Sequence, residues 1–253
     1  MAYWQKRWEF LNSVEYEYTY IGNYGAKGEK RKPKVKPTAE QIAKQNQTNR
    51  TNAVRRLIKQ NFSPGDYWIT LKYAAGTRKG AEEVRKDMKR FLDNMRNAYK
   101  RQKQQFKYIY RVEIGSRGGI HIHIILNRIT GKPNTDVLVE RYWKGGHPHF
   151  ALLYEDGGYS QLASYLVKPA LEEQEDSYLK SYHPSRNLVK PEPKVKKYEK
   201  WTVRKFVEEG PVPQEGFYID QDTVESGENP YTGMSYLHYT EVRIKPIRGS
   251  DTG

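Results

Sequence analysis

Apolar and polar residues alternate with a two-residue period in several short segments of the chain, most clearly in Ile120–Leu126. This segment carries His121 and His123 two positions apart inside an apolar run. Because alternate side chains of a β-strand face the same way, both histidines project from one face of the predicted strand. The opposite face carries Ile122, Ile124 and Leu126. The pattern therefore predicts a buried strand that presents two imidazoles.

Further elements follow from the same kind of pattern. Extended segments predict strands at 67–72, 107–114 and around 149–154, and a strand or extended arm within residues 1–26. Apolar residues at helical spacing predict helices at 38 to about 59, 80 to about 104, and 159–167. Thr38 and Gln41 fit a capping box at the start of the first helix.

The order of these elements indicates the fold class. The turn at 115–119 is too short for a parallel crossover, so the strands on either side of it form an antiparallel hairpin. We expect an α+β fold, a central antiparallel sheet with helices packed on one face. Residues 1–60 are expected to form an N-terminal arm, basic linker and helix, and residues 61–180 the central domain. Residues 181–253 are expected to be a basic C-terminal extension with short strands.

Composition narrows the class of protein. The chain has 44 Lys and Arg residues against 30 Asp and Glu, a net charge of +14, which points to a polyanionic partner such as nucleic acid. The absence of cysteine excludes disulfides and thiolate-bound zinc. No apolar run approaches a membrane span, and residues 1–8 lack the apolar core of a signal peptide, so we expect a cytoplasmic protein with no membrane partner.

The histidine strand is a candidate metal site, because neutral imidazole is the commonest protein metal ligand. The predicted hairpin brings Glu113 towards this strand as a third ligand. Two imidazoles and one carboxylate leave coordination positions for water and substrate oxygens. As alternatives, Glu113 could pair with Arg111 or Arg117, and the histidines could be structural. The second His-x-His segment, 147–149, contains a proline and is predicted to be a loop.

Tyr165 and Lys168 lie three positions apart in a predicted helix and therefore share a face. A phenol with its pKa near ~10 is a poor nucleophile at neutral pH. A neighbouring ammonium favours the phenolate or neutralises a bound phosphate. The pair is a candidate catalytic nucleophile and its assisting cation.

In combination and in this order, the His-x-His strand, the upstream Glu113 and the Tyr165-x-x-Lys168 helix resemble the HUH endonuclease superfamily. More narrowly they resemble rolling-circle replication initiators, the Rep class of bacterial plasmids and phages. The strand around Thr70 is similar to the first family motif, residues 119–126 to the second and residues 162–168 to the third. The resemblance covers about residues 66–170. Pro169 stands where many relatives carry an acidic residue.

The resemblance implies a single-strand DNA nickase and strand transferase. Glu113, His121 and His123 would hold Mn²⁺ or Mg²⁺, and Tyr165 would attack the scissile phosphate with help from Lys168. This leaves a 5′-phosphotyrosyl link and a 3′-hydroxyl that primes synthesis. The partner would be single-stranded origin DNA or its hairpin. No Walker-type motif is present, so helicase and polymerase would be separate host proteins and no nucleotide cofactor is expected.

Contacts to the nucleic acid are predicted at Thr70 in the first motif, at Arg117 in the hairpin turn, and in two basic segments for which solvated loops are the alternative. The segment residues are Lys30, Arg31, Lys32, Lys34, Lys36, Arg186, Lys194, Lys196 and Lys197. Two other functions remain open: a single-strand transposase of the same superfamily, and a relative that holds single-stranded DNA or a hairpin without cutting it.

Overall fold

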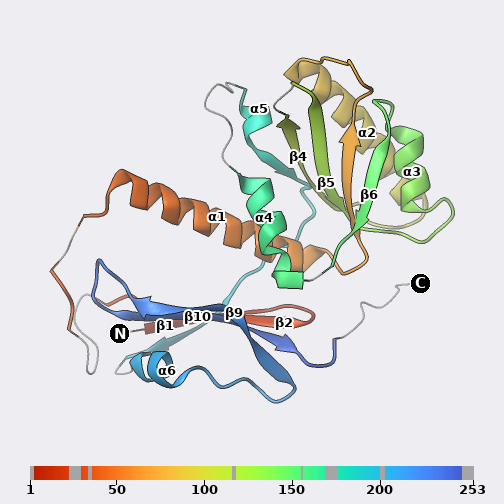
Figure 1. The fold of residues 1–253 in the computed structure, drawn as a ribbon. Helices are drawn as coiled ribbons and strands as arrows, with labels where there is room; N and C mark the ends of the chain where they lie inside the picture. The colour runs from red at the N-terminus through yellow and green to blue at the C-terminus, as the bar shows by residue number, and fades with distance from the viewer. Residues whose placement is uncertain are drawn as a thin grey trace. The chain divides into compact units, whose positions relative to one another are not determined.

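A computed structural model describes residues 3–22, 30–33, 36–115, 118–154, 156–168, 176–199 and 203–246. The chain forms two compact units (Figure 1). We call residues 49–189 the central unit and residues 1–48 together with 190–253 the terminal unit. Each unit contains an antiparallel five-stranded sheet, which confirms the α+β class.

The sheet of the central unit has the strand order β6-β3-β5-β4-β7. Its strands are β3 (Tyr67–Lys72), β4 (Tyr108–Ile114), β5 (Ile120–Leu126), β6 (Pro148–Leu152) and β7 (Tyr182–Pro184). β3 has the predicted bounds and β4 begins one residue later than predicted. β4 and β5 form the predicted antiparallel hairpin. The histidine strand β5 lies in the middle of the sheet, between β3 and β4.

Three of the helices follow the sequence pattern closely. They are α1 (Ala39–Asn61), α2 (Ala81–Arg101) and α4 (Ser160–Val167). Thr38 and Gln41 form the predicted capping box, with the two reciprocal hydrogen bonds at 2.8 and 3.2 Å. A short 3₁₀ turn, η1 (Asp156–Tyr159), leads into α4. The pattern did not indicate α3 (Thr135–Tyr142) or the one-turn helix α5 (Ser177–Lys180).

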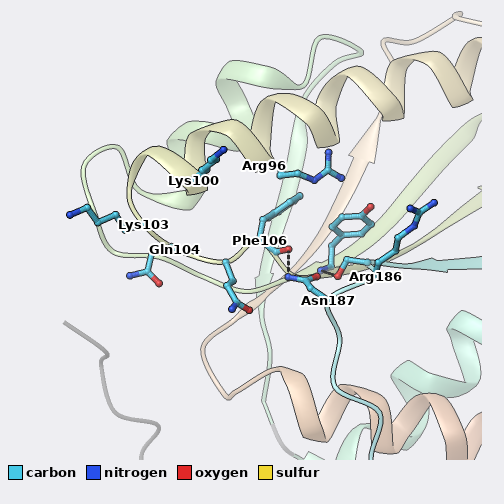
Figure 2. A pocket seen from close by; sticks show the side chains of 10 residues that line it. Arg96, Lys100, Lys103, Gln104, Phe106, Arg186 and Asn187 are labelled. Carbon is cyan, nitrogen blue, oxygen red and sulfur yellow. Dashed lines mark hydrogen bonds between the residues drawn. The ribbon is translucent and has the colours of Figure 1, made fainter.

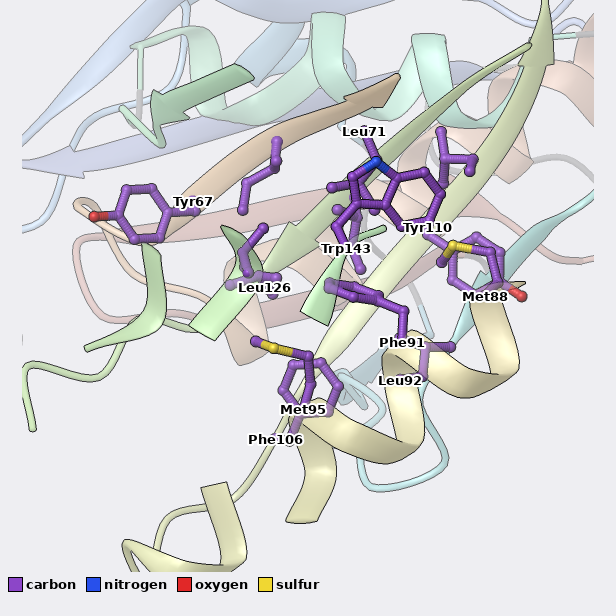
Figure 3. Close-up of a cluster of buried hydrophobic side chains, with 14 of the residues drawn as sticks. Tyr67, Leu71, Met88, Phe91, Leu92, Met95, Phe106, Tyr110, Leu126 and Trp143 are labelled. Carbon is purple, nitrogen blue, oxygen red and sulfur yellow. The ribbon is translucent and has the colours of Figure 1, made fainter. Parts of the chain in front are cut away.

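Helices cover both faces of the central sheet, so the expectation of helices on one face was wrong. The face that carries Ile122 and Ile124 packs against α2 and α3, and Figure 3 shows this core around Phe91 and Trp143. The other face packs in part against the second half of α1 and against α4, through Ile125 and its neighbours. The sheet needs two covers because its strands carry apolar residues on both faces, and the histidine face is apolar only over part of its length.

The segment His147–His149 was also interpreted wrongly as a loop. β6 begins at Pro148 and pairs with β3, with His149 opposite Thr70. β6 is an edge strand of the sheet, and Pro148 is its first residue. Proline is tolerated at this position because its missing N–H removes no hydrogen bond from the interior of the ladder.

The terminal unit joins both ends of the described chain in one sheet of order β8-β1-β2-β10-β9. Its elements are β1 (Tyr3–Glu9), β2 (Ser13–Tyr20), β8 (Lys194–Tyr198), α6 (Arg204–Glu209), β9 (Phe217–Glu228) and β10 (Ser235–Arg243). Tyr16 of β2 and Tyr239 of β10 are opposite each other and stack with ring centroids 4.8 Å apart. The sequence pattern indicated short strands at both ends but not that they pair.

None of the helices within the described ranges has the length and apolar character needed to cross a membrane.

Ile122 has no solvent exposure and lies in the middle strand of the central sheet. We predict that Ile122→Ala lowers the free energy of unfolding by about 2–5 kcal/mol, because the lost side chain leaves a cavity that strands on both sides prevent from closing. Val137 in α3 is 41% exposed, so Val137→Ala should shift the urea midpoint much less. Equal shifts in the two variants would contradict the assigned burial.

Candidate active site

The register of three strands gathers polar side chains on one face of the central sheet. Within the hairpin, Glu113 is opposite His121 and Arg111 is opposite His123. On the other side of β5, Thr70 of β3 is opposite His123. Directly opposed residues of an antiparallel pair project from the same face. All five side chains therefore share the face that α4 partly covers.

The turn that joins the two hairpin strands fixes this register. The Gly115 amide donates to the Gly119 carbonyl at 2.8 Å, and the Gly118 amide donates to the Gly115 carbonyl at 2.8 Å. Gly118 has φ +72°, a left-handed conformation that glycine adopts at low cost. Ser116 and the predicted DNA contact Arg117 lie outside the described residues.

α4 places Tyr165 over this polar face. Its hydroxyl donates a hydrogen bond to Oε2 of Glu113. Its ring lies 4.8 Å from the ring of His123 and 5.9 Å from that of Trp68, edge to face in both cases. The structure thus brings together three residues that the sequence selected from separate motifs: Glu113, His123 and Tyr165.

His123 is held on several sides, with one ring nitrogen left towards the site. Its Nδ1 lies 3.2 Å from the Thr70 hydroxyl, and its ring stacks on Trp68 at 5.3 Å. Its Nε2 lies 3.2 Å from Oε2 of Glu113, yet this buried atom makes no hydrogen bond of acceptable geometry. A polar partner on one imidazole nitrogen that leaves the other free towards a site is the usual arrangement around a histidine metal ligand.

His121 completes the predicted donor set less closely. Its ring lies 6.4 Å from that of His123 and is partly exposed. Within the described part of the chain, no group of three His, Cys, Asp or Glu side chains is close enough to form a metal cluster. The donor types nevertheless fit a divalent ion, because the unbonded Nε2 of His123, the Glu113 carboxylate and a second imidazole share one face.

Burial and the contact between Tyr165 and Glu113 set the protonation of the site. Burial, reinforced by the Glu113 carboxylate, raises the pKa of Tyr165, so its phenol is neutral at neutral pH. Burial alone would raise the pKa of Glu113, but Tyr165, His123 and Lys168 together lower it. Burial lowers the pKa of His123 despite the opposing effect of Glu113. The carboxylate is therefore ionised and the imidazole neutral, the forms that bind a metal ion.

Arg111 holds the end of α4 in place. It is only 6% exposed, and its Nη1 donates to the carbonyl oxygens of Leu166 at 2.8 Å and Tyr165 at 3.4 Å. These carbonyls belong to the last turn of α4, where a helix leaves acceptors without intrahelical partners and attracts cations. Arg111 thus links β4 to the helical turn that carries Tyr165.

Lys168 caps the C-terminal end of α4 rather than lying within the helix. It is exposed and lines an open depression of about 520 Å³ together with Tyr165. Ser160, Gln161 and Ser164 complete that lining. Tyr159, in contrast, is only 4% exposed and packs in the core beside α4.

The predicted DNA contacts fall in different parts of the fold. Thr70 contacts His123, and Arg186 lines a separate pocket of the central unit. The remaining described ones belong to the terminal unit: Lys30, Arg31, Lys32, Lys36, Lys194, Lys196 and Lys197. Lys34 lies outside the described residues.

The three cations of β8 are on an exposed edge strand rather than a loop. Lys194 pairs with Glu9 at 2.8 Å, while the ammonium groups of Lys196 and Lys197 lie over the rings of Tyr198 and Trp4. Lys32 pairs with Glu228.

Sequence reasoning missed the roles of Arg111 and Trp68. Arg111 had been considered only as an ion-pair partner of Glu113. The alternation that placed Arg111 and Glu113 on one face was already a signal that Arg111 lies at the site. Trp68 belongs to the same predicted strand as Thr70 and lies on the same face, two positions away.

Comparison with protein families identifies the region that contains this site. Residues 66–170 match the family model of the replication-associated protein ORF2. This matched region runs from the start of β3 to just beyond α4, less than half of the chain. It includes Glu113, His121, His123, Tyr165 and Lys168. Comparison of the chain with curated proteins and with solved structures gives no match.

We predict that Arg111→Met loosens the end of α4 that carries Tyr165. Two carbonyl groups lose their buried donor, at a cost of about 1–3 kcal/mol each. Hydrogen–deuterium exchange should show faster exchange over residues 160–168 than in the wild type, and Arg111→Lys should restore part of the protection. The exposed Arg128 offers the control Arg128→Met. Unchanged exchange over 160–168 in Arg111→Met would contradict the anchoring role.

Proposed function

We propose that the protein is an HUH-type replication initiator, a single-strand DNA nickase and strand transferase that starts rolling-circle replication. The contact between the Tyr165 hydroxyl and Glu113, next to His123, is the observation that carries the proposal. It supports nuclease chemistry because it joins a nucleophile, a carboxylate and an imidazole within the region that matches a replication-associated family.

In the proposed reaction the phenolic oxygen of Tyr165 attacks the phosphorus of the scissile phosphodiester. The bond from phosphorus to the 3′-oxygen breaks and a phosphotyrosyl bond to the 5′ side forms, so the number of phosphodiester bonds is unchanged. The phenol must lose its proton, and Oε2 of Glu113 already accepts its hydrogen bond. The departing 3′-oxygen gains a proton from solvent or from Lys168. Attack by a 3′-hydroxyl on the phosphotyrosine reverses the step and rejoins the DNA.

The residues around Tyr165 have distinct roles in this proposal. Glu113, His121 and His123 would hold a divalent ion, and imidazole ligation suits Mn²⁺ better than Mg²⁺. When bound, the ion would polarise a non-bridging oxygen of the scissile phosphate. Lys168 supplies positive charge on the open side of the site, where the phosphate enters.

The expected partners follow from the reaction. The substrate is single-stranded origin DNA, exposed as a strand or a hairpin in the cytoplasm. Host proteins supply helicase and polymerase activities. A transposase would use the same residues on transposon ends, and a non-cleaving binding protein would leave the DNA intact.

Tyr165→Phe should abolish the covalent protein–DNA adduct and leave DNA binding within about twofold, because only the attacking oxygen is removed. The assay incubates the protein with a labelled single-stranded origin oligonucleotide and Mn²⁺ and detects the adduct on a denaturing gel. Tyr154 is 64% exposed in the same unit, so Tyr154→Phe is the matched control and should form the adduct normally.

Two outcomes contradict this account in different ways. An adduct that persists in Tyr165→Phe and maps to another tyrosine refutes the assignment of the nucleophile. Tight binding of the oligonucleotide by the wild type without any adduct refutes nickase activity and favours the non-cleaving alternative.

A further inference from the structure

A second site of the central unit lies at the end of the sheet where β4 begins. It is a pocket of about 800 Å³ between the end of α2, the start of β4 and the residues that follow β7 (Figure 2). Four cations line it: Arg96, Lys100, Lys103 and Arg186. The lining includes no Asp or Glu. Like charges that converge without carboxylates repel one another, so a site of this composition is stabilised by an anion.

The helix dipole does not account for this charge. Lys100 and Lys103 lie at the C-terminal end of α2, where cations are favourable in any helix. Arg186 comes from a segment that follows β7, far along the chain, and still lines the same pocket. Asp93 pairs with Arg96 at 2.6 Å but does not line the pocket.

The backbone holds these cations in place. The Ser185 amide donates to the Tyr108 carbonyl at 2.8 Å, and the Tyr108 amide donates to the Ser185 hydroxyl at 3.1 Å. Asn187 donates from its side chain to the Phe106 carbonyl at 3.2 Å, the dashed line in Figure 2. Arg186 is therefore fixed between two anchored neighbours. A preorganised cation binds an anion with less loss of entropy than one on a free loop.

Lys103 stands in a strained backbone position. Its φ is +55°, in the left-handed region where a residue with a Cβ costs roughly 1–2 kcal/mol and glycine is usual after a helix. The chain thus keeps a lysine at the rim of the pocket where a glycine would relieve strain. Strain of this kind is often retained at binding sites.

The remaining lining suits a nucleotide rather than a simple anion. The half-buried ring of Tyr108 packs 5.1 Å from that of Phe106 on the pocket wall, and offers a surface on which a base can stack. The amide groups of Gln104, Gln105 and Asn187 can hydrogen-bond base edges. The volume far exceeds that of one phosphate group.

We propose that this basic pocket binds a segment of single-stranded nucleic acid, with two or three phosphates on the cations and a base against Tyr108. Tyr108 and Glu113 are at opposite ends of β4, about 17 Å apart at the rise of a strand, and their side chains project from opposite faces. The pocket therefore takes a segment that flanks the scissile phosphate. The site does not depend on the cleavage reaction.

The test measures binding of a fluorescein-labelled single-stranded oligonucleotide by anisotropy, without added metal and in the Tyr165→Phe background. The pocket variant combines Lys100→Gln, Lys103→Gln and Arg186→Gln. The control variant combines Lys86→Gln, Lys132→Gln and Arg141→Gln, three exposed cations of the same unit outside the pocket. Each phosphate contact contributes about 0.7 to the salt slope for single strands. We expect the pocket variant to lose roughly tenfold in affinity and about 2 in slope, and clearly more than the control.

Two results would overturn the proposal. One is an equal loss of affinity and slope in the pocket and control variants. The other is competition by a deoxynucleoside triphosphate as strong as that by unlabelled oligonucleotide at equal phosphate concentration, which would make the pocket a mononucleotide site. With Tyr165 restored, adduct formation by the pocket variant at saturating oligonucleotide reports separately on the proposed nickase.

Discussion

The register between β4 and β5 is the constraint on which the rest of the site depends. A slip of one residue would turn every side chain of one strand to the other face of the sheet. His121 and His123 would then enter the apolar core, and Ile122 and Ile124 would face α4. The short turn at Gly115–Gly119 and the burial of Ile122 and Ile124 both prevent this slip. The same packing that stabilises the fold therefore positions the imidazoles.

The histidine face divides between packing and chemistry. Near the start of β4, Ile109 and Ile125 pack against α1 and α4. Further along the same strand, Arg111 and Glu113 make the face polar. Arg111 connects the two halves, because its guanidinium holds the last turn of α4 while its neighbour Glu113 receives the hydroxyl of Tyr165. The nucleophile candidate is thus held by the sheet as well as by its own helix.

Local patterns predicted the elements that are regular over their whole length. β3, β4, β5 and α2 were evident because their periods are uninterrupted, and the resemblance to replication initiators identified the region that the family model also matches. The terminal sheet was not predicted, because its strands pair across nearly the whole chain and no local pattern records which strand pairs with which. Pro148 concealed β6, since proline argues against a strand unless the strand is known to lie at an edge.

The candidate site could be predicted in its residue types but not in its contacts. Spacing selected Glu113, His123 and Tyr165, but it gave no indication that the phenol contacts the carboxylate, because that contact depends on how α4 packs on the sheet. The role of Arg111 was missed for the same reason. The basic pocket was missed because its cations come from two segments that meet only in the folded unit.

The central claim is that the polar face of the β4–β5 hairpin is a metal site that faces the nucleophile. It is tested most directly by titrating the protein with Mn²⁺ and following the free ion by electron paramagnetic resonance. The account predicts one tight site in the wild type and in Tyr165→Phe. Glu113→Gln and the double variant His121→Ala, His123→Ala should bind Mn²⁺ at least about tenfold more weakly while they stay folded. Unchanged Mn²⁺ affinity in both variants would place the metal elsewhere and contradict the account.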